Sequence, residues 1–229
     1  MTETPEEQRK RWQEISPYWT AVSDATRQHN KHVAPSAERN VEPISARLAE
    51  RLPAQGRALE IASGTGQHVV AFAHRLPGIE WTPSDPHPAA RRSVAAWIAD
   101  SGLANVYAPL ELDVTAAGWD AAVEPGLDAM VAINLLHISP WAACEGLLAG
   151  AGRLLKPGGV LCTYGCFKRG GRHLSSGNAE FDRSLKYRDP SWGVRAVEDV
   201  AAEADCHGLK LAEAIDMPAN NLMLVLTPR

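Results

Sequence analysis

The sequence lacks the features that mark membrane, secreted and metal-binding proteins. Its 229 residues contain no run of about 18 or more apolar residues, so no transmembrane helix is expected. The first eleven residues are polar and charged, which argues against a secretory signal peptide. The four cysteines, Cys144, Cys162, Cys166 and Cys206, form no CxxC pair and no zinc-type spacing. These absences predict a cytoplasmic protein with reduced cysteines and no metal site.

The chain also has fewer basic than acidic residues. The chain has 23 Lys and Arg against 27 Asp and Glu, which gives a net charge of −4. Phosphate contacts require a basic surface, so nucleic acid is not expected as a partner. The hydrophobic share of 45% and the charged share of 22% are close to globular averages. We therefore expect a globular monomer or homodimer that binds a small molecule, with no membrane partner.

From about residue 36 onward, helical and strand patterns alternate along the chain. The helix that starts this series has Ser36 as its expected N-cap and ends before Pro53, and a later one starts at Ser139-Pro140. Strands are predicted over 58–62, 79–82, 106–112, 129–134 and 160–164, and further helices over 67–76, 88–100 and 197–206. Strict alternation predicts an α/β fold, a parallel sheet with helices on both faces. The last two strands, 210–215 and 222–226, are joined by a short loop and must pair antiparallel.

The first 35 residues differ in composition from the rest of the chain. They contain Trp12, Tyr18, Trp19, His29 and His32 among polar residues, and Pro17 interrupts any long helix. We expect residues 1–35 to form a helical, aromatic lid over a pocket. Residues 36–229 are expected to form a single domain.

The turn after the first predicted strand carries the strongest functional signal. It runs from Glu60 to His68, and Gly64 and Gly66 allow the backbone to approach a ligand in front of a helix N-terminus. Asp85 follows the second strand, 19 residues beyond Gly66, where an acceptor for a ribose diol belongs. Asp113 follows the third strand. Because parallel strands end at one edge, these residues are expected to lie together.

The details of the turn discriminate between nucleotide cofactors. A dinucleotide site requires a third glycine where this chain has Val69, and no GK[ST] sequence follows to hold ATP. A carboxylate at Glu60 would repel a pyrophosphate but would suit a cationic ligand. S-adenosylmethionine has a sulfonium, an ammonium and an adenosine but no phosphate, so it fits the pattern best.

The segment Leu59-Glu60-Ile61-Ala62-Ser63-Gly64-Thr65-Gly66 resembles the first motif of class I S-adenosylmethionine-dependent methyltransferases. Asp85, Asp113, Asn134 and Lys156-Pro157-Gly158-Gly159 resemble their later motifs in order. More narrowly, the chain resembles the methyltransferase-like protein 26 family of uncharacterised methyltransferases. The phrases that carry this narrower resemblance are Ala37-Glu38-Arg39-Asn40, Glu60 to His68, Pro83-Ser84-Asp85, His137-Ile138-Ser139-Pro140-Trp141, Ser191-Trp192-Gly193-Val194-Arg195 and Met217-Pro218-Ala219-Asn220-Asn221.

The resemblance implies a Rossmann-like, seven-stranded, mostly parallel sheet that ends in an antiparallel hairpin. It also implies that Gly64 and Gly66 contact the methionine part of the cofactor, Asp85 the ribose and Asp113 the adenine region. The full set expected to bind the cofactor is Glu60, Ala62, Ser63, Gly64, Gly66, His68, Asp85, Asp113, Val114 and Asn134. Cys166 departs from the proline expected at its position, and this leaves the substrate open.

Methyl transfer is an in-line displacement, so positioning matters most and a base is needed only when the acceptor must lose a proton. The expected catalytic residues are His137, Asn134 and Tyr164, although His137 could instead stabilise the following helix. Residues 167–182 are rich in Gly, Ser and Arg and are expected to form a polar loop that covers the substrate. The residues expected to bind the substrate are Trp19, His32, Arg39, Asn40, Phe167, Asn178, Asp182 and Arg195.

Several alternatives stay open at this stage. A surface salt bridge would also explain Arg195, and a turn would explain Asn220-Asn221. The segment Asn134-Leu135-Leu136-His137 lacks the Pro-Pro-aromatic sequence that holds a flipped DNA base, so a DNA base is not expected as the methyl acceptor. The leading hypothesis is a methyltransferase (EC 2.1.1.-) that acts on an N, S or O atom of a small polar molecule. The competing hypotheses are a catalytically silent cofactor-binding protein and a nucleotide-dependent reductase.

Overall fold

The central sheet of the computed structural model, which describes residues 31–229, has the strand order β2–β1–β3–β4–β9–β8. Its strands are β1 (Gly56–Ile61), β2 (Ile79–Pro83), β3 (Leu127–Ile133), β4 (Leu155–Gly165), β8 (Leu209–Met217) and β9 (Asn221–Pro228). The pairs β1–β2, β1–β3 and β3–β4 are parallel, whereas β4–β9 and β9–β8 are antiparallel. The predicted α/β class, with a parallel sheet and a reversed C-terminal hairpin, is confirmed.

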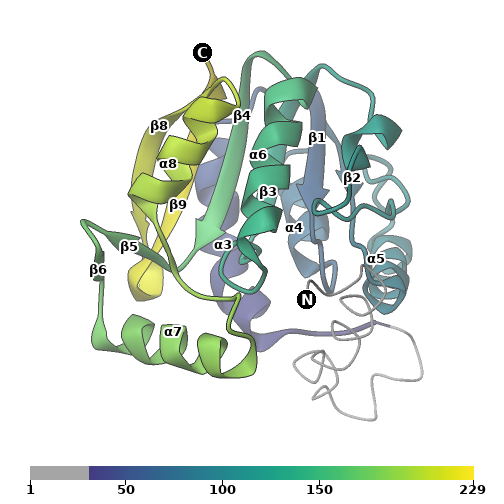
Figure 1. Ribbon diagram of the computed structural model, residues 1–229. Helices are drawn as coiled ribbons and strands as arrows, with labels where there is room; N and C mark the ends of the chain where they lie inside the picture. The colour runs from purple at the N-terminus through teal and green to yellow at the C-terminus, as the bar shows by residue number, and fades with distance from the viewer. Residues whose placement is uncertain (1–30) are drawn as a thin grey trace.

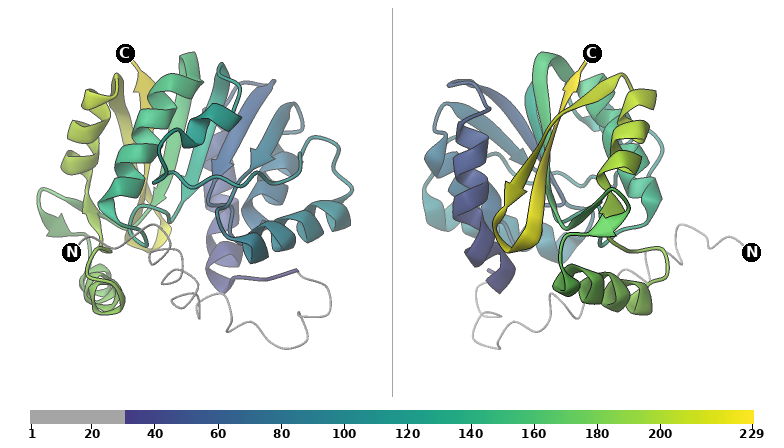
Figure 2. Two further views of the ribbon diagram at one scale, coloured as in Figure 1. Left: turned by 45° about the vertical axis from the view of Figure 1, so that its right-hand side comes forward. Right: turned by 90° about the vertical axis from the view of Figure 1, so that its left-hand side faces the viewer.

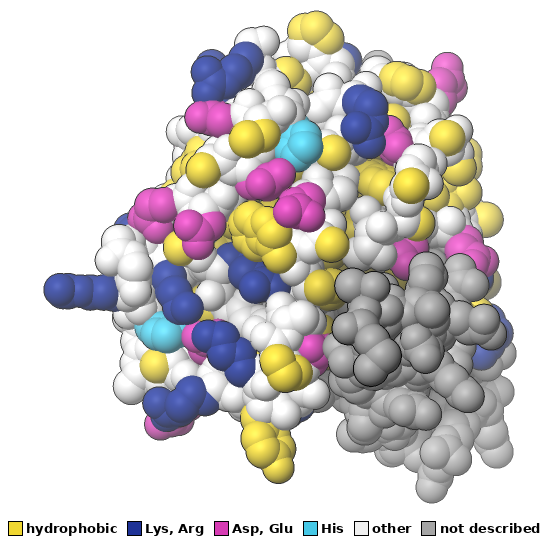
Figure 3. Space-filling view, in the orientation of Figure 1, with side chains coloured by type: hydrophobic (Ala, Val, Ile, Leu, Met, Phe, Trp, Pro, Cys, Tyr) yellow, Lys and Arg dark blue, Asp and Glu magenta, His cyan; other side chains and the backbone are white. Residues whose placement is uncertain are grey.

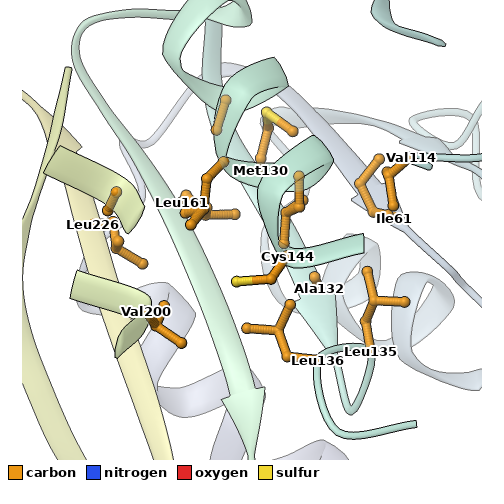
Figure 4. Close-up of a cluster of buried hydrophobic side chains, with 14 of the residues drawn as sticks. Ile61, Val114, Met130, Ala132, Leu135, Leu136, Cys144, Leu161, Val200 and Leu226 are labelled. Atoms are coloured by element: carbon orange, nitrogen blue, oxygen red, sulfur yellow. The ribbon is translucent and has the colours of Figure 1, made fainter. Parts of the chain in front are cut away.

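Helices cover both faces of this sheet (Figures 1 and 2). The helices α3 (Pro35–Ala49), α4 (Gln67–Arg75) and α5 (Pro88–Ser101) pack on one face, and α6 (Trp141–Leu154) and α8 (Val197–Cys206) pack on the other. Every residue of β3 is buried, as expected for a central parallel strand whose two faces are both covered. Figure 4 shows side chains of α6 and α8, such as Cys144 and Val200, meeting Leu161 and Leu226 of the sheet.

The third predicted strand, over residues 106–112, does not form as a strand. Only two isolated parallel bridges link this segment to β2 and the residue after it, at Trp81–Val106 and Ser84–Leu110. Pro83 and Pro109 lie between these bridges on the two opposing segments, and neither has a backbone N–H to donate. Within residues 31–229 the central sheet therefore has six strands rather than the expected seven, and the segment that leads to Asp113 is a loop held beside β2.

Two helices begin one or two residues away from the predicted N-cap. In α3 the N-cap is Ala34, followed by Pro35, so the expected N-cap Ser36 is already inside the helix. In α6 the N-cap is Pro140, because the Ser139 hydroxyl donates to Leu135 O at 2.7 Å instead of capping the helix. In both cases a proline at the helix start was a better signal than the serine.

The predicted polar loop over residues 167–182 is largely ordered secondary structure. It contains β5 (Phe167–Arg169), β6 (Arg172–His173) and the start of α7 (Ser176–Arg188), and the short β7 (Arg195–Ala196) pairs with β5. The remaining elements are the 3-10 turns η2 (Trp119–Ala122) and η3 (Pro218–Asn220). We call residues 167–196 the cap segment; α7 lies below the arrowhead of β4 in Figure 1, at the carboxyl edge of the parallel strands.

Among residues 31–229, no helix has both the length and the apolar composition needed to cross a membrane.

Candidate functional site

The turn between β1 and α4 adopts the backbone geometry expected of a ligand-binding turn. Ala62, Gly64 and Gly66 have φ values of 55°, 57° and 92°. A Cβ atom on Gly66 would lie 2.8 Å from Val94 Cα, so glycine is required for α4 and α5 to approach each other here. The backbone N–H of Ser63 donates to Ser84 O at 2.8 Å, which ties the turn to the end of β2.

Asp85 connects this turn to the segment after β2. Its carboxylate accepts the backbone N–H of Gly64 at 3.0 Å and that of His87 at 2.9 Å, and the side chain is buried. Burial raises the pKa of Asp85 to about 6, while the two backbone donors and Arg91 oppose the rise. A carboxylate oxygen can accept more than one hydrogen bond, so Asp85 retains capacity to accept from a ligand hydroxyl.

Glu60 is buried at the end of β1 with an unsatisfied carboxylate. Its Oε2 atom has no hydrogen-bond partner within residues 31–229. Burial, reinforced by the charge of Asp85, raises the pKa of Glu60 to about 8, and a hydrogen bond from Ser63 acts in the opposite direction. An unpartnered buried carboxylate is costly, and a ligand that brings a positive charge would offset this cost.

Asp113 and Val114 lie in the loop that follows the Ser84–Leu110 bridge. Asp113 is half-buried, and its Oδ1 accepts the backbone N–H of Thr115 at 2.9 Å and the Thr115 hydroxyl at 2.6 Å. Val114 is buried, and its carbonyl lies so close to α6 that a Cβ on Gly146 would be 1.8 Å from it. The loop is thereby fixed against α6 beside the end of β2.

His68 belongs to a group of polar residues on the α3 and α4 side of the sheet. Its Nε2 lies 2.7 Å from Oδ1 of Asn40, and both side chains are buried. Burial lowers the pKa of His68 to about 4, so the ring is neutral at physiological pH. Tyr164, at the end of β4, is also buried; burial raises the pKa of its hydroxyl, and the neighbouring side chains of Asn40 and Asn221 oppose the rise. The structure therefore brings Asn40, His68 and Tyr164 together.

Asn134 and His137 lie beyond β3, next to Gly165 at the end of β4. Asn134 has a φ of 60°, and its N–H donates to Tyr164 O at 2.7 Å. A Cβ on Gly165 would lie 2.7 Å from both Nδ1 and Cε1 of His137 and 3.6 Å from Oδ1 of Asn134. The space beside Gly165 is thus occupied by the His137 ring, which stacks edge-on against Phe181 at 5.4 Å between centroids.

The His137 ring is buried, and its Nδ1 has no partner among the described residues. Burial, with a smaller contribution from Arg195, lowers the pKa of His137 to about 4. The ring is neutral at pH 7 and able to accept a proton or a hydrogen bond.

Two charged residues expected to bind substrate, Arg195 and Asp182, make several contacts that hold the cap segment. Arg195 donates to the carbonyls of Leu136 at 2.9 Å, Ser139 at 2.6 Å and Ser191 at 2.9 Å. Asp182 accepts the N–H of Val194 at 2.8 Å. It also pairs with three cationic or ionisable side chains, those of His173, Lys168 and Lys186. These pairs and the hydrogen bond lower the pKa of Asp182 well below its ordinary value, against burial that raises it.

The other expected substrate residues occupy different positions. Phe167 is buried in β5, and Asn178 of α7 donates to Asn220 O at 2.8 Å. Arg39 is exposed on α3. The backbone of His32 is held on α5, because its N–H donates to Ser93 Oγ at 2.8 Å and its carbonyl accepts from Trp97 Nε1 at 2.8 Å. Trp19 lies outside the described residues.

Four residues that sequence reasoning did not assign belong to this region: Ser84, Gly165, Phe181 and Asn221. Ser84 is fully buried, and its Oγ donates to Glu60 O at 2.7 Å. Its position in the sequence alone did not predict a role for it. Asn221 Oδ1 accepts from Cys166 Sγ at 3.1 Å. The Pro83-Ser84-Asp85 and Asn220-Asn221 phrases contain two of these residues, but nothing in the sequence pairs them with Glu60 or Tyr164.

A family model described as "Protein of unknown function (DUF938)" matches residues 31–227. The chain belongs to this family. The match runs from before α3 to residue 227, the last residue but one of β9.

Solved methyltransferase structures share the fold of this DUF938 chain. An O-methyltransferase family protein from Burkholderia thailandensis has a TM-score of 0.71 at 17% identity, over 84% of this chain and 56% of that chain. An O-methyltransferase family 2 protein from Planctomyces limnophilus DSM 3776, in complex with apigenin, has a TM-score of 0.69 at 18% identity, over 85% of this chain and 60% of that chain.

A third structure is NcsB1, an O-methyltransferase from neocarzinostatin biosynthesis in complex with S-adenosylmethionine and 2-hydroxy-5-methyl naphthoic acid. Its TM-score is 0.63 at 15% identity, over 84% of this chain and 57% of that chain. The chain spans a little over half the length of these three proteins. At such low identity the likeness establishes the fold, which is the Rossmann-like methyltransferase fold.

A separate hollow of about 560 Å³ is lined by residues of the cap segment together with α6 and α8. It is lined by Trp141, Lys168, Lys186, Arg195 and Glu203, among others. Figure 3 shows Lys and Arg side chains gathered on the lower left of this face. The cations in the hollow are balanced by Asp199, Glu203 and the buried Asp182, so the hollow has no charge excess that selects a ligand.

Proposed function

We propose that this protein is an S-adenosylmethionine-dependent methyltransferase that acts on a small polar molecule. The observation that carries the proposal is the arrangement at the end of β1. The positive-φ turn of Gly64 and Gly66 lies beside Asp85, and Glu60, whose Oε2 has no hydrogen-bond partner among the described residues, is buried at the end of β1. These groups suit a ligand that has a ribose and a positive charge but no phosphate.

The residues that would hold the cofactor are those expected from the sequence. Asp85 would accept from the ribose, Glu60 would face the charged methionine part, and the backbone of Gly64 and Gly66 would lie against it. Asp113 and Val114, fixed against α6, would line the adenine region, while Ala62, Ser63, His68 and Asn134 would complete the site. When bound, S-adenosylmethionine supplies an electrophilic methyl group on a sulfonium.

This chain's own contribution to the reaction is positioning and proton handling at the edge of β3 and β4. The neutral His137 ring would accept a proton from an acceptor O–H, N–H or S–H group through its buried Nδ1. Asn134 and Tyr164, joined through the Asn134 N–H and the Tyr164 carbonyl, would orient the acceptor. The cap segment, placed over the strand ends, would exclude water.

The low-identity structural neighbours support the same proposal. NcsB1 was solved with S-adenosylmethionine and a naphthoic acid, and the Planctomyces limnophilus protein with apigenin. We further propose kinship with the methyltransferase-like protein 26 family and EC class 2.1.1. The proposed organisation is a substrate-covering segment over residues 1–35 and a catalytic domain over 36–229, in a cytoplasmic monomer or homodimer without nucleic-acid or membrane partners.

Titration calorimetry with S-adenosylmethionine and S-adenosylhomocysteine tests this function. We expect both to bind, and we expect Asp85→Ala to weaken both by about tenfold or more, because the ribose loses a buried acceptor. Wild-type protein that binds neither compound would refute the proposal. Binding without any methylated product from a small-molecule extract would favour the catalytically silent alternative.

A further inference from the structure

A group of uncharged polar side chains lies at the end of β4, between α3 and the β8–β9 turn. We call Asn40, His68, Tyr164, Cys166 and Asn221 the neutral cluster. They come from α3, α4, β4, the residue after β4 and β9, so the fold brings together positions far apart in the sequence. His68 donates to Asn40 at 2.7 Å, and Cys166 Sγ lies 3.1 Å from Asn221 Oδ1.

Every member of the neutral cluster is uncharged at physiological pH. Burial lowers the pKa of His68 to about 4 and raises the pKa of Cys166 to about 11. Burial also raises the pKa of Tyr164 above its ordinary value. Asn40 and Asn221, whose side chains neighbour Tyr164, are amides and carry no charge.

Two charged residues of the cap segment, Arg195 and Asp182, are already committed to other partners. Arg195 holds three backbone carbonyls, those of residues 136, 139 and 191. Asp182 is surrounded by His173, Lys168 and Lys186 and by the N–H of Val194. A charged ligand bound at the neutral cluster would lose its hydration without gaining a counter-charge there, which is unfavourable.

The position of Asn221 is fixed by the turn before it. Ala219 and Asn220 have φ values of 59° and 55°, and Asn178 of α7 donates to Asn220 O at 2.8 Å. Asn221 itself is half-buried, and its Nδ2 donates to Pro218 O at 3.1 Å. Asn221 therefore has a defined orientation and remains partly accessible to solvent.

We propose that the methyl acceptor is an uncharged polar molecule that hydrogen-bonds to Asn40, Tyr164 and Asn221. This inference rests on the proposed methyltransferase function. Amide and phenol groups can both donate and accept, so they match hydroxyl, amide and carbonyl groups of such an acceptor.

The test uses the full chain, S-adenosylmethionine with a labelled methyl group and a small-molecule extract of cells that make the protein. The extract is first divided on ion-exchange resins at neutral pH into anionic, cationic and unretained pools, and each pool is assayed separately. We expect the label to be transferred mainly to the unretained pool. Transfer mainly to the anionic or the cationic pool would overturn the inference while leaving the methyltransferase function intact.

Two variants connect the acceptor to the cluster. Asn221→Ala and the isosteric Asn221→Asp should reduce transfer to the unretained pool by about tenfold, with S-adenosylmethionine affinity unchanged within about twofold. Retained affinity shows that a variant is folded. Glu124→Gln, at an exposed site before β3, is the matched control and should transfer label like the wild type. Full transfer by both Asn221 variants would overturn the assignment.

The proposed function fails in a different way from this inference. If the protein is not a methyltransferase, wild-type protein transfers label to none of the three pools. If only the acceptor class is wrong, label is transferred to a charged pool, or the Asn221 variants transfer as much label as the wild type.

Discussion

At the scale of single residues, Glu60 and Asp85 are buried carboxylates that the folded protein keeps at a cost. Burial raises the pKa of Glu60 to about 8 and that of Asp85 to about 6. The native state therefore holds these protons more tightly than the unfolded chain does. Stability is then largest at low pH and is lost as pH rises, from about 4.5 towards about 8 for Glu60. A cost of this kind at one turn is typical of a binding site.

Glu60→Gln should make the unliganded protein more stable at alkaline pH. The amide has nearly the same shape but cannot ionise, so we expect an unfolding free energy higher by about 1–3 kcal/mol at about pH 9, and little difference below about pH 4.5. The same variant should bind S-adenosylmethionine about tenfold more weakly, because a charge-assisted contact is lost. Urea denaturation at both pH values and calorimetry measure the two effects. Equal stability of variant and wild type at about pH 9 would contradict the buried, ionisable state of Glu60.

His137→Asn should affect turnover without affecting cofactor binding. His137 is neutral at pH 7, with a pKa of about 4, so as a base it is in its active form over the whole physiological range. We expect kcat to fall by about a hundredfold or more, and the affinity for S-adenosylhomocysteine to stay the same. In the wild type the protonation of His137 should reduce kcat only as pH falls towards about 4. A wild-type kcat in the variant would show that His137 is not the base and only packs beside Gly165.

At the scale of elements, sequence patterns predicted buried strands well and irregular segments poorly. The strands β1, β3 and β4 contain apolar runs that stay apolar because both faces of a parallel sheet are buried. The segment 106–112 has a similar apolar content, but Pro83 and Pro109 remove two donors from the ladder, and only isolated bridges form. Pro109 lies inside the segment and was a signal against a regular strand, whereas the effect of Pro83 could not be seen because it belongs to the opposing segment.

The cap segment was missed for a different reason. Its helix α7 has a polar sequence, with Phe181 and Leu185 as its main apolar contacts to the cluster of Trp192 and Val194. Two apolar residues four positions apart give only a weak helical period. Ser175, whose side chain accepts from Asn178 N–H, was the available signal for a helix start.

Gly146→Ala in α6 should loosen the loop that carries Asp113 and Val114. A Cβ at this position would lie 1.8 Å from Val114 O, so the helix and the loop must separate. We expect a loss of about 1–3 kcal/mol in unfolding free energy despite the better helix propensity of alanine, and weaker cofactor binding. Gly177→Ala in α7 is the matched control, since the added Cβ would meet only Ser175 Oγ at 3.7 Å. If the urea midpoints of both variants equal the wild-type midpoint, the contact between α6 and the loop is dispensable.

At the scale of the whole molecule, the candidate site depends on contacts that no local pattern encodes. Glu60, Asp85 and Asn134 were predictable, because each follows or ends a strand and parallel strands end at one edge. The partnership of Asn40, Tyr164 and Asn221 was not, because it requires α3, β4 and the β8–β9 turn to meet. Likewise, the spacing around Arg195 could not reveal that its guanidinium holds three loop carbonyls.

The first 30 residues join the described fold next to the cofactor turn. His32 and Ala34 are tied to this region, through Ser93 Oγ at 2.8 Å and Gln67 Oε1 at 2.6 Å, and Ser93 in turn donates to the carbonyl of Thr65 in the turn. All residues proposed to bind the cofactor lie beyond this junction. We therefore expect a chain that starts at residue 31 to bind S-adenosylmethionine like the full chain.

The same truncated chain should lose turnover, because the aromatic residues before the junction are proposed to cover the acceptor. Calorimetry and transfer of labelled methyl groups, measured on the same two preparations, separate the two effects. Loss of cofactor binding would mean that the first 30 residues help to form the cofactor site. Full turnover by the truncated chain would exclude them from the acceptor site, and the enclosure of the acceptor would then have to come from the cap segment alone.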